Sequence, residues 1–215
     1  MNDPHWSDSY VKFLRQVAPE LADVPIYLLR NDEHPVEWVS HWMAMFSPLS
    51  DLKAQSTLER LGLWSGRGVC VIVRNDFAAW STRCQAGTLL HEMSHGIEHI
   101  TQPHALATEL SPICREWLEV GESKMLADAG IDRNDLIRGQ HGSAFVRLCC
   151  HLHQRARGEM HLTASDLQFL HRAYSLPPER YEDVVEALRS ELAMTRNLNL
   201  LRLREAPATF LELFK

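Results

Sequence analysis

Cysteines are scarce in this sequence, and none of them has the spacing of a paired or metal-binding motif. The 215 residues contain no C-x-x-C motif and an odd number of cysteines, namely Cys70, Cys84, Cys114, Cys149 and Cys150. This pattern argues against a disulfide-held scaffold and against a zinc ribbon. The adjacent pair at 149–150 is expected to pack as small apolar residues within a helix.

Long hydrophobic runs and a signal peptide are also missing. No segment approaches the roughly 18 consecutive apolar residues of a membrane-spanning helix, so no membrane span is predicted. The first eight residues, MNDPHWSD, are polar and acidic, which predicts a cytoplasmic protein. The length and the hydrophobic fraction of 45% suit a soluble protein with one core, so we expect a single domain over residues 1–215.

The sequence has no basic tract, and its formal net charge is −6. Nucleic acid is therefore not favoured as a partner on the basis of charge. Single arginines on helices are usually solvated. We therefore expect the following arginines to be exposed to solvent: Arg133, Arg138, Arg147, Arg155 and Arg157.

One motif carries the chemistry. Residues 91–95 read His91-Glu92-Met93-Ser94-His95, an H-E-x-x-H pattern. On a helix, residues four apart lie on one face, so His91 and His95 can direct two imidazoles at one metal ion. Glu92 can then reach a water on that metal without binding the ion itself. The pattern is that of a zinc hydrolase, with Zn²⁺ as cofactor.

The surroundings of the motif favour a helix over about residues 82–100. Thr82 and Gln85 have capping-box spacing at the helix start. A buried apolar stripe is expected along the helix, from Leu89, Met93, Ile97 and Ile100. The segment around the two histidines resembles the extended signature of zincin metallopeptidases, in which the flanking positions are uncharged and an apolar residue closes the pattern.

A catalytic zinc site needs a third protein ligand, and His141 is the first candidate. It opens the sequence His141-Gly142-Ser143-Ala144-Phe145 before a helical run. This element resembles the third-ligand segment of SprT-like metallopeptidases, a minimal zincin family. The resemblance implies that His141 binds zinc and that Phe145 packs the following helix into the core. His141 lies 46 residues after His95, a longer spacing than that family leads us to expect.

The sequence also offers alternative candidates for the third zinc ligand. Glu122 or Glu119, on a predicted second helix, would provide the glutamate ligand that gluzincins use. His99 lies one turn beyond His95, where a third ligand on the same straight helix would make poor tetrahedral angles. His104 follows a proline and is a further alternative. A hydrogen-bond donor is also needed to stabilise the oxyanion of the transition state. The candidates for it are His171, Arg172, Tyr174 and Tyr181, and the sequence does not choose between them.

The predicted fold is α+β, a minimal zincin-like domain with a small mixed sheet on a mostly helical body. Strands are expected at 24–30 and 68–74. The zincin resemblance implies that the second is an edge strand which pairs with extended substrate, and an ordinary core strand is the alternative. Helices are expected over 6–19, 52–62, 142–157 and 178–194, with a short one around Trp38, Trp42 and Phe46. Residues 101–140 are predicted to be a helical insertion, and residues 197–215 a tail that wraps the core or meets a partner.

Two functions compete. The first is a zinc metallopeptidase in which Glu92, as general base, takes a proton from the metal-activated water that attacks a peptide bond. Its partner would be a protein or peptide substrate, and the SprT-like resemblance also implies a link to DNA-associated substrates. The alternative is a non-catalytic, metal-binding protein of the same fold that acts in partner binding or regulation. The oligomeric state is not predicted.

Overall fold

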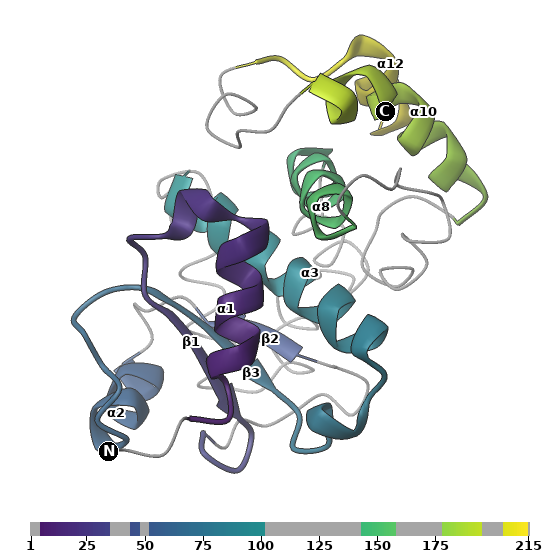
Figure 1. Cartoon of the computed structure of the whole chain (residues 1–215). Helices are drawn as coiled ribbons and strands as arrows, with labels where there is room; N and C mark the ends of the chain where they lie inside the picture. Colours follow the sequence, from purple (N-terminus) through teal and green to yellow (C-terminus); the bar gives the residue numbers. More distant parts are fainter. Residues whose placement is uncertain are drawn as a thin grey trace, which may run out of the picture.

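A computed structural model of the 215-residue chain describes residues 5–34, 44–47, 52–101, 143–157, 178–194 and 204–214. The fold is α+β and mostly helical (Figure 1). In chain order, the longer elements are α1 Asp8–Val17, β1 Ile26–Arg30, β2 Ala44–Ser47, α2 Leu52–Arg60, β3 Val69–Val73, α3 Thr82–Thr101, α8 Ser143–Ala156 and α10 Tyr181–Met194. Short helical turns are Pro19–Leu21, Phe77–Ala79, Pro178–Arg180, α12 Ala208–Leu211 and Glu212–Phe214.

The three strands form a mixed sheet in the order β1-β3-β2. β1 pairs with β3 in parallel, and β2 pairs with β3 antiparallel. Gly68 lets β3 begin close against the start of β1, because the Val69 amide donates to the carbonyl of Pro25, the residue before β1, at 2.9 Å. Gly68 has φ +132°, and a Cβ there would stand 2.3 Å from the same Pro25 oxygen. Both the backbone conformation and the space at this position require glycine.

Successive side chains of β1 and β3 enter two different cores, as the period of a strand requires. Ile26 and Leu28 join Val69, Val71 and Val73 on the face covered by α1, α3 and α8. The alternate side chains face the other way and pack with Leu58 of α2 and the segment that follows it: Tyr27, Leu29, Cys70 and Ile72. The sheet is therefore covered on both faces.

The prediction that 68–74 forms the edge strand is wrong. β3 lies between β1 and β2, and all five of its residues are buried. A continuous apolar run such as Val69-Cys70-Val71-Ile72-Val73 suits a strand with both faces covered, whereas a half-solvated strand alternates polar and apolar residues. Within the described residues, the antiparallel strand at the sheet edge is β2, and it contacts α3.

The short helix predicted around Trp38, Trp42 and Phe46 is also incorrect at its last position. Phe46 lies in β2, opposite Val71 of β3. Residues 38 and 42 lie outside the described part of the chain. The four-residue spacing of the aromatic residues suggested a helix, but cross-strand pairing with β3 determines the structure of this segment.

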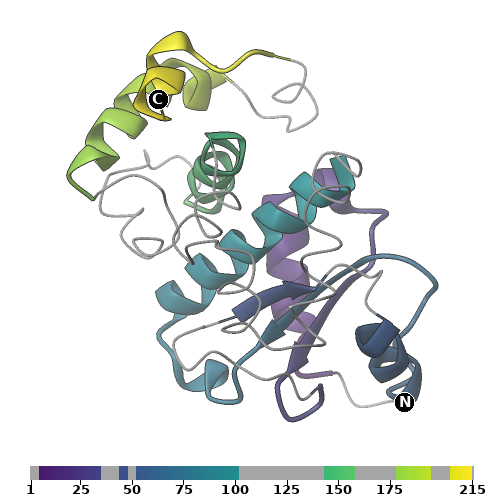
Figure 2. The ribbon, with the colours of Figure 1, turned by 180° about the vertical axis from the view of Figure 1, so that it is seen from behind.

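A second apolar layer lies beyond the sheet and its helices. In both ribbon views α8 lies between α3 and α10 (Figures 1 and 2), and it contacts both of them. One side of α8 contributes Leu148 and Leu152 to the first core, and the opposite side forms a second cluster with α10 and the C-terminal segment. Phe210 of α12 is fully buried in that cluster, so residues 204–214 pack against the body, as the tail prediction allowed.

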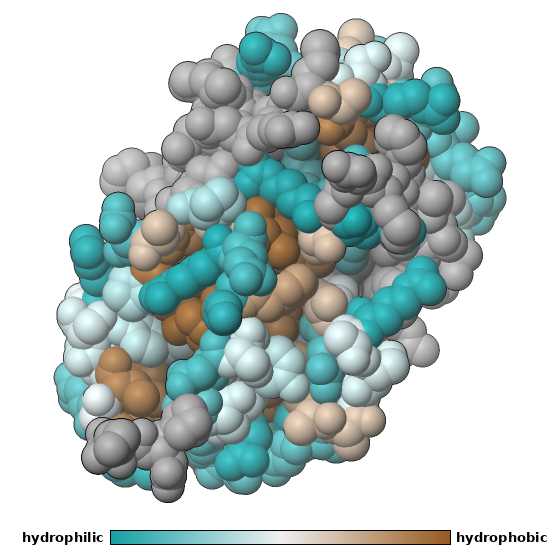
Figure 3. Space-filling view, in the orientation of Figure 1, coloured by the Kyte–Doolittle hydropathy of each residue, from teal (hydrophilic) through white to brown (hydrophobic). Residues whose placement is uncertain are grey.

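The predicted insertion over 101–140 lies outside the described residues except for Thr101, which ends α3. In the described part of the chain, no helix has the length and apolarity needed to cross a membrane. Hydrophilic side chains cover much of the surface drawn in Figure 3, with apolar residues visible between them. Leu211 is the single large apolar side chain that is exposed among the described residues.

Candidate metal centre

The helix predicted over 82–100 is confirmed as α3, Thr82–Thr101. Its start differs by one residue from the predicted capping box. Ser81, and not Thr82, caps the helix, since its Oγ accepts from the Cys84 amide at 3.3 Å. Gln85 turns back onto the preceding turn, where its amide donates to the carbonyls of Phe77 at 3.0 Å and Ala78 at 3.2 Å. These contacts tie the start of α3 to the helical turn Phe77–Ala79 that follows β3.

The predicted apolar stripe is also confirmed where the side chains are described. Leu89, Met93 and Ile97 are buried in the first core. His91 and His95 each follow a stripe residue by two positions, or about 200° around the helix. The two imidazoles therefore lie on the side of α3 opposite the stripe, and α8 covers this side. Both histidines remain partly exposed.

The two imidazole rings lie together, with centroids 5.1 Å apart and planes inclined by 80°. Phe145, from the first turn of α8, contacts both rings. Its centroid lies 4.3 Å from that of His95 in a stacked arrangement and 4.9 Å from that of His91 in an edge arrangement. Phe145 is itself fully buried. Two segments about 50 residues apart in the chain thus meet at the histidine pair.

Glu92, the proposed base, is 7% exposed. It follows His91 directly and so lies about 100° around the helix from that residue, between the histidine side and the core. The neighbouring polar residues on α3 are also buried. Ser94 donates its hydroxyl to the Leu90 carbonyl at 2.7 Å, which satisfies that hydroxyl within its own helix. Glu92 is thus a carboxylate held beside the imidazole pair and largely shielded from solvent.

This arrangement can bind one divalent cation through two imidazoles, with a carboxylate nearby. No protein-family model, curated protein or solved structure matches this chain. The assignment of the site therefore depends on its own geometry.

The candidates for the third ligand lie outside the described residues, and this applies to His141, Glu122, Glu119 and His104. The side chain of His99 is likewise outside them. Within the described ranges, no group of three His, Cys, Asp or Glu side chains is close enough to hold a metal ion. The described part of the candidate site could offer a metal ion the nitrogens of His91 and His95, and a zinc site would need a third protein ligand from the rest of the chain.

Among the oxyanion candidates, only Tyr181 lies in the described residues. It is 1% exposed and packs in the second cluster, and burial together with Glu179 raises the pKa of its phenol to about 12. This degree of burial argues against contact with a substrate.

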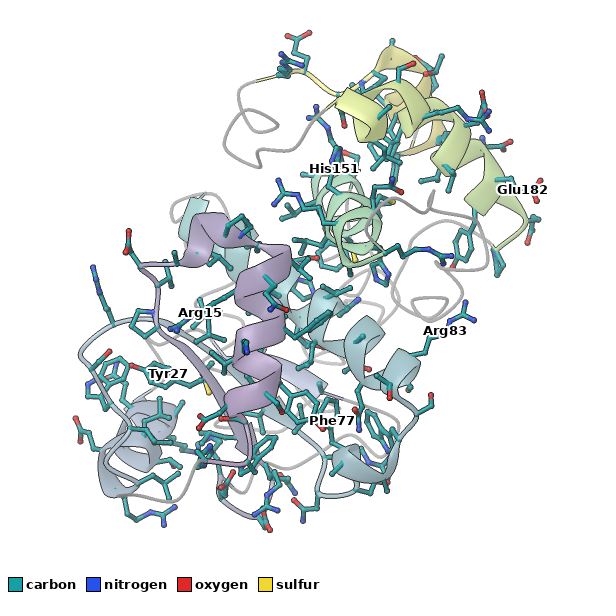
Figure 4. The ribbon with its side chains drawn as sticks, in the orientation of Figure 1. Arg15, Tyr27, Phe77, Arg83, His151 and Glu182 are labelled. Atoms are coloured by element: carbon teal, nitrogen blue, oxygen red, sulfur yellow. The ribbon has the colours of Figure 1, made fainter. Side chains whose placement is uncertain are left out.

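The sequence interpretation missed a charged cluster behind Phe145. Arg147 was expected to be solvated, but it is 9% exposed and forms an ion pair with Glu191 of α10, which also lies 2.8 Å from His151. Figure 4 shows His151 on α8, below the C-terminal helices. The signal was present in the sequence. Arg147 and His151 are four apart in the stretch 144–152 of α8, whose other residues are apolar, and two such residues on a buried face require a carboxylate partner.

The same helix should make the protein sensitive to acid. Burial, with the charge of Arg157 nearby, lowers the pKa of His153 from 6.5 to about 4. Between these values the unfolded chain binds a proton that the folded chain does not, so stability falls as the pH drops from 6.5 towards 4. The full loss is about 3 kcal/mol, at 1.36 kcal/mol for each pKa unit.

A second loss of folding stability follows at lower pH. Burial alone would raise the pKa of Glu191, but hydrogen bonds from His151 and Arg147 outweigh it and lower the pKa from 4.5 to about 2. The stability that this carboxylate provides is present above 4.5 and is lost as the pH falls towards 2. Urea unfolding at a series of pH values tests both steps. His153→Leu should flatten the profile above pH 4.5 and keep the lower step. An unchanged profile in that variant would contradict the assignment.

Proposed function

We propose that this chain is a zinc-dependent metallopeptidase of zincin type, with His91, His95 and His141 as ligands and Glu92 as general base. The observation that supports this most is the imidazole pair on α3, whose ring centroids are 5.1 Å apart beside a buried carboxylate. Helix geometry alone brings together any two histidines four residues apart. What a chance motif on a surface helix would lack is the buried Glu92 and the cover that Phe145 of α8 gives to both rings.

The ring separation fits a shared ion. An imidazole that binds zinc at about 2.1 Å through a ring nitrogen has its centroid roughly 3.2 Å from the ion, and two such rings at a tetrahedral angle have centroids roughly 5 Å apart. Phe145 is compatible with this geometry, because it stacks on the face of His95. A metal bonds in the plane of the imidazole, at its edge. The Nδ1 atom of His91 is buried, which favours Nε2 as its binding nitrogen.

The position of Phe145 supports His141 as the third ligand. Phe145 touches both imidazoles, and only four peptide units, at most about 14 Å of extended chain, connect it to residue 141. The long spacing between His95 and His141 in sequence is therefore no obstacle in space, because α8 returns to α3 at this point. Glu122 and Glu119 have no comparable link to the described part of the site.

A bound zinc ion would lower the pKa of a coordinated water towards neutrality and polarise the substrate carbonyl. Glu92 would accept the proton of that water and later donate it to the leaving amine. Its burial keeps bulk water away from the carboxylate, which strengthens its interaction with the proton that it transfers. His91 and His95 would orient the reacting centre from the partly exposed side of α3.

The substrate would be a protein or peptide in extended form. Strand β2 forms one edge of the sheet within the described residues and contacts α3, the helix of the site. A peptide added to that edge would pair through its backbone, which is a general way to hold extended chains. The edge that supports peptide binding is thus β2, in place of the predicted 68–74 strand.

Removal of metal provides the first test of this function. We expect that treatment with a chelator abolishes hydrolysis of quenched fluorescent casein, and that stoichiometric zinc restores it, because both the nucleophile and the carbonyl depend on the ion. Metal content is measured on the same samples by mass spectrometry. Hydrolysis that persists in metal-free protein would contradict the proposal.

A further inference from the structure

A cluster of buried charged residues connects α8 to the C-terminal part of the chain. Arg147 and His151 of α8 and Glu191 of α10 are 9%, 1% and 9% exposed. We call these three residues the α8 anchor. None of them belongs to the proposed catalytic site.

The α8 anchor joins three segments through one guanidinium. Arg147 donates from Nε to Glu191 Oε1 at 3.0 Å and from Nη2 to Oε2. It also donates from Nη1 to the Arg204 carbonyl at 2.9 Å and from Nη2 to the Glu205 carbonyl at 3.3 Å. His151 Nε2 lies 2.8 Å from Glu191 Oε1. The position of α8 is thereby fixed against both α10 and the C-terminal segment.

Buried charges are an expensive way to gain stability, because their desolvation offsets most of their attraction. What buried charge pairs do provide is a defined relative orientation of the elements that carry them. A bidentate arginine–carboxylate pair accepts one geometry, whereas apolar side chains can slide past one another. The α8 anchor is therefore suited to fixing how α8 lies, along its axis and in rotation.

That orientation matters because the first turn of α8 forms the wall of the histidine pair. Phe145 lies two residues before Arg147, and its ring contacts both His91 and His95. It also belongs to the same apolar cluster as Phe210 of the C-terminal segment. A small rotation of α8 would move Phe145 away from the imidazoles.

We propose that the α8 anchor is a positioning device for the metal centre, an inference that rests on the proposed zinc function. Arg147, His151 and Glu191 hold α8 so that Phe145 fixes the orientation of the two imidazoles before the ion binds. The C-terminal segment is part of this device through the carbonyls of residues 204 and 205. These residues do not contact the ion, and they act on it through Phe145 and the start of α8.

The test is the zinc affinity of Glu191→Gln, measured by competition with a chromophoric chelator at a temperature where the protein is folded. We expect about tenfold weaker zinc binding, the lower end of what loss of a supporting residue costs a metal site. Glu186→Gln is the matched control on the same helix, because Glu186 pairs with Arg189 at the surface, with side chains 65% and 72% exposed. Its zinc affinity should equal that of the wild type.

A second control separates positioning from general stability. Leu58→Ala removes a fully buried side chain from the opposite face of the sheet and should lower the unfolding temperature while leaving zinc affinity unchanged. If Glu191→Gln does not fold, Arg147→Lys is the deciding variant, because lysine keeps the positive charge but lacks the forked guanidinium that bonds to both α10 and the C-terminal segment. We expect Arg147→Lys to give an intermediate affinity.

The outcomes distinguish the two proposals. If the wild type binds zinc and both α8-anchor variants bind it equally well, the positioning role is wrong and the metallopeptidase proposal stands. A Leu58→Ala protein that loses as much affinity as Glu191→Gln would also overturn the positioning role. If the wild type does not bind zinc, both proposals fail.

Discussion

Glu92→Gln should keep the zinc and lose the activity. The amide has nearly the same shape as the carboxylate but cannot accept the proton of the attacking water, so we expect kcat/KM to fall by about 10²–10⁴-fold with little change in KM. Zinc content and unfolding temperature should stay close to those of the wild type, because Glu92 is not a ligand. The measurement is hydrolysis of quenched casein with metal analysis of each sample.

Glu59→Gln is a suitable control, since Glu59 is exposed on α2, across the sheet from the site. It should retain full activity. Undiminished hydrolysis by Glu92→Gln would show that another group is the base. A wild-type protein that binds zinc but cleaves nothing would favour the alternative function, a metal-binding protein of this fold without catalysis.

The second large effect concerns the third ligand. His141→Ala should weaken zinc binding by about 100-fold, because the 10–16 kcal/mol with which structural sites bind zinc, divided over four ligands, gives roughly 3 kcal/mol for each. Glu122→Ala and Glu119→Ala should change the affinity by less than about twofold if those residues do not bind the ion. Competition titration of all three variants provides the comparison.

The opposite result would assign a different set of ligands to the zinc site. If Glu122→Ala or Glu119→Ala loses the zinc and His141→Ala retains it, the third ligand is a carboxylate, as in gluzincins. The short covalent link between Phe145 and residue 141 would then have no role in binding. Equal losses in all variants would point to an effect on folding, which the unfolding temperatures would reveal.

Much of the region that carries the site could be predicted from local sequence. The short apolar run of β3, rich in β-branched residues, and the i, i+4 stripe of α3 are strong local signals, and both elements occur where they were expected. The pairing of His91 with His95 follows from helix geometry alone. Such features depend on residues within one or two helical turns, so they need no knowledge of the tertiary fold.

The features that the sequence did not reveal depend on distant partners. Strand β2 has only four residues, and it is a strand because β3 lies beside it. Because β2 pairs with β3, β2 forms the edge of the sheet and β3 lies inside it. Arg147 looked like a surface arginine because its partner Glu191 is 44 residues away. The approach of Phe145 to the imidazoles likewise required the path of α8, which no local pattern encodes.

In the proposed site, α3 presents two imidazoles to one zinc ion beside Glu92. Anomalous diffraction collected above and below the zinc absorption edge, on crystals grown with zinc, tests it most directly. We predict one strong peak about 2.1 Å from a ring nitrogen of His91 and of His95, with His141 as the third protein ligand. A map with no peak between these two rings, or with zinc bound elsewhere on the chain, would contradict the account.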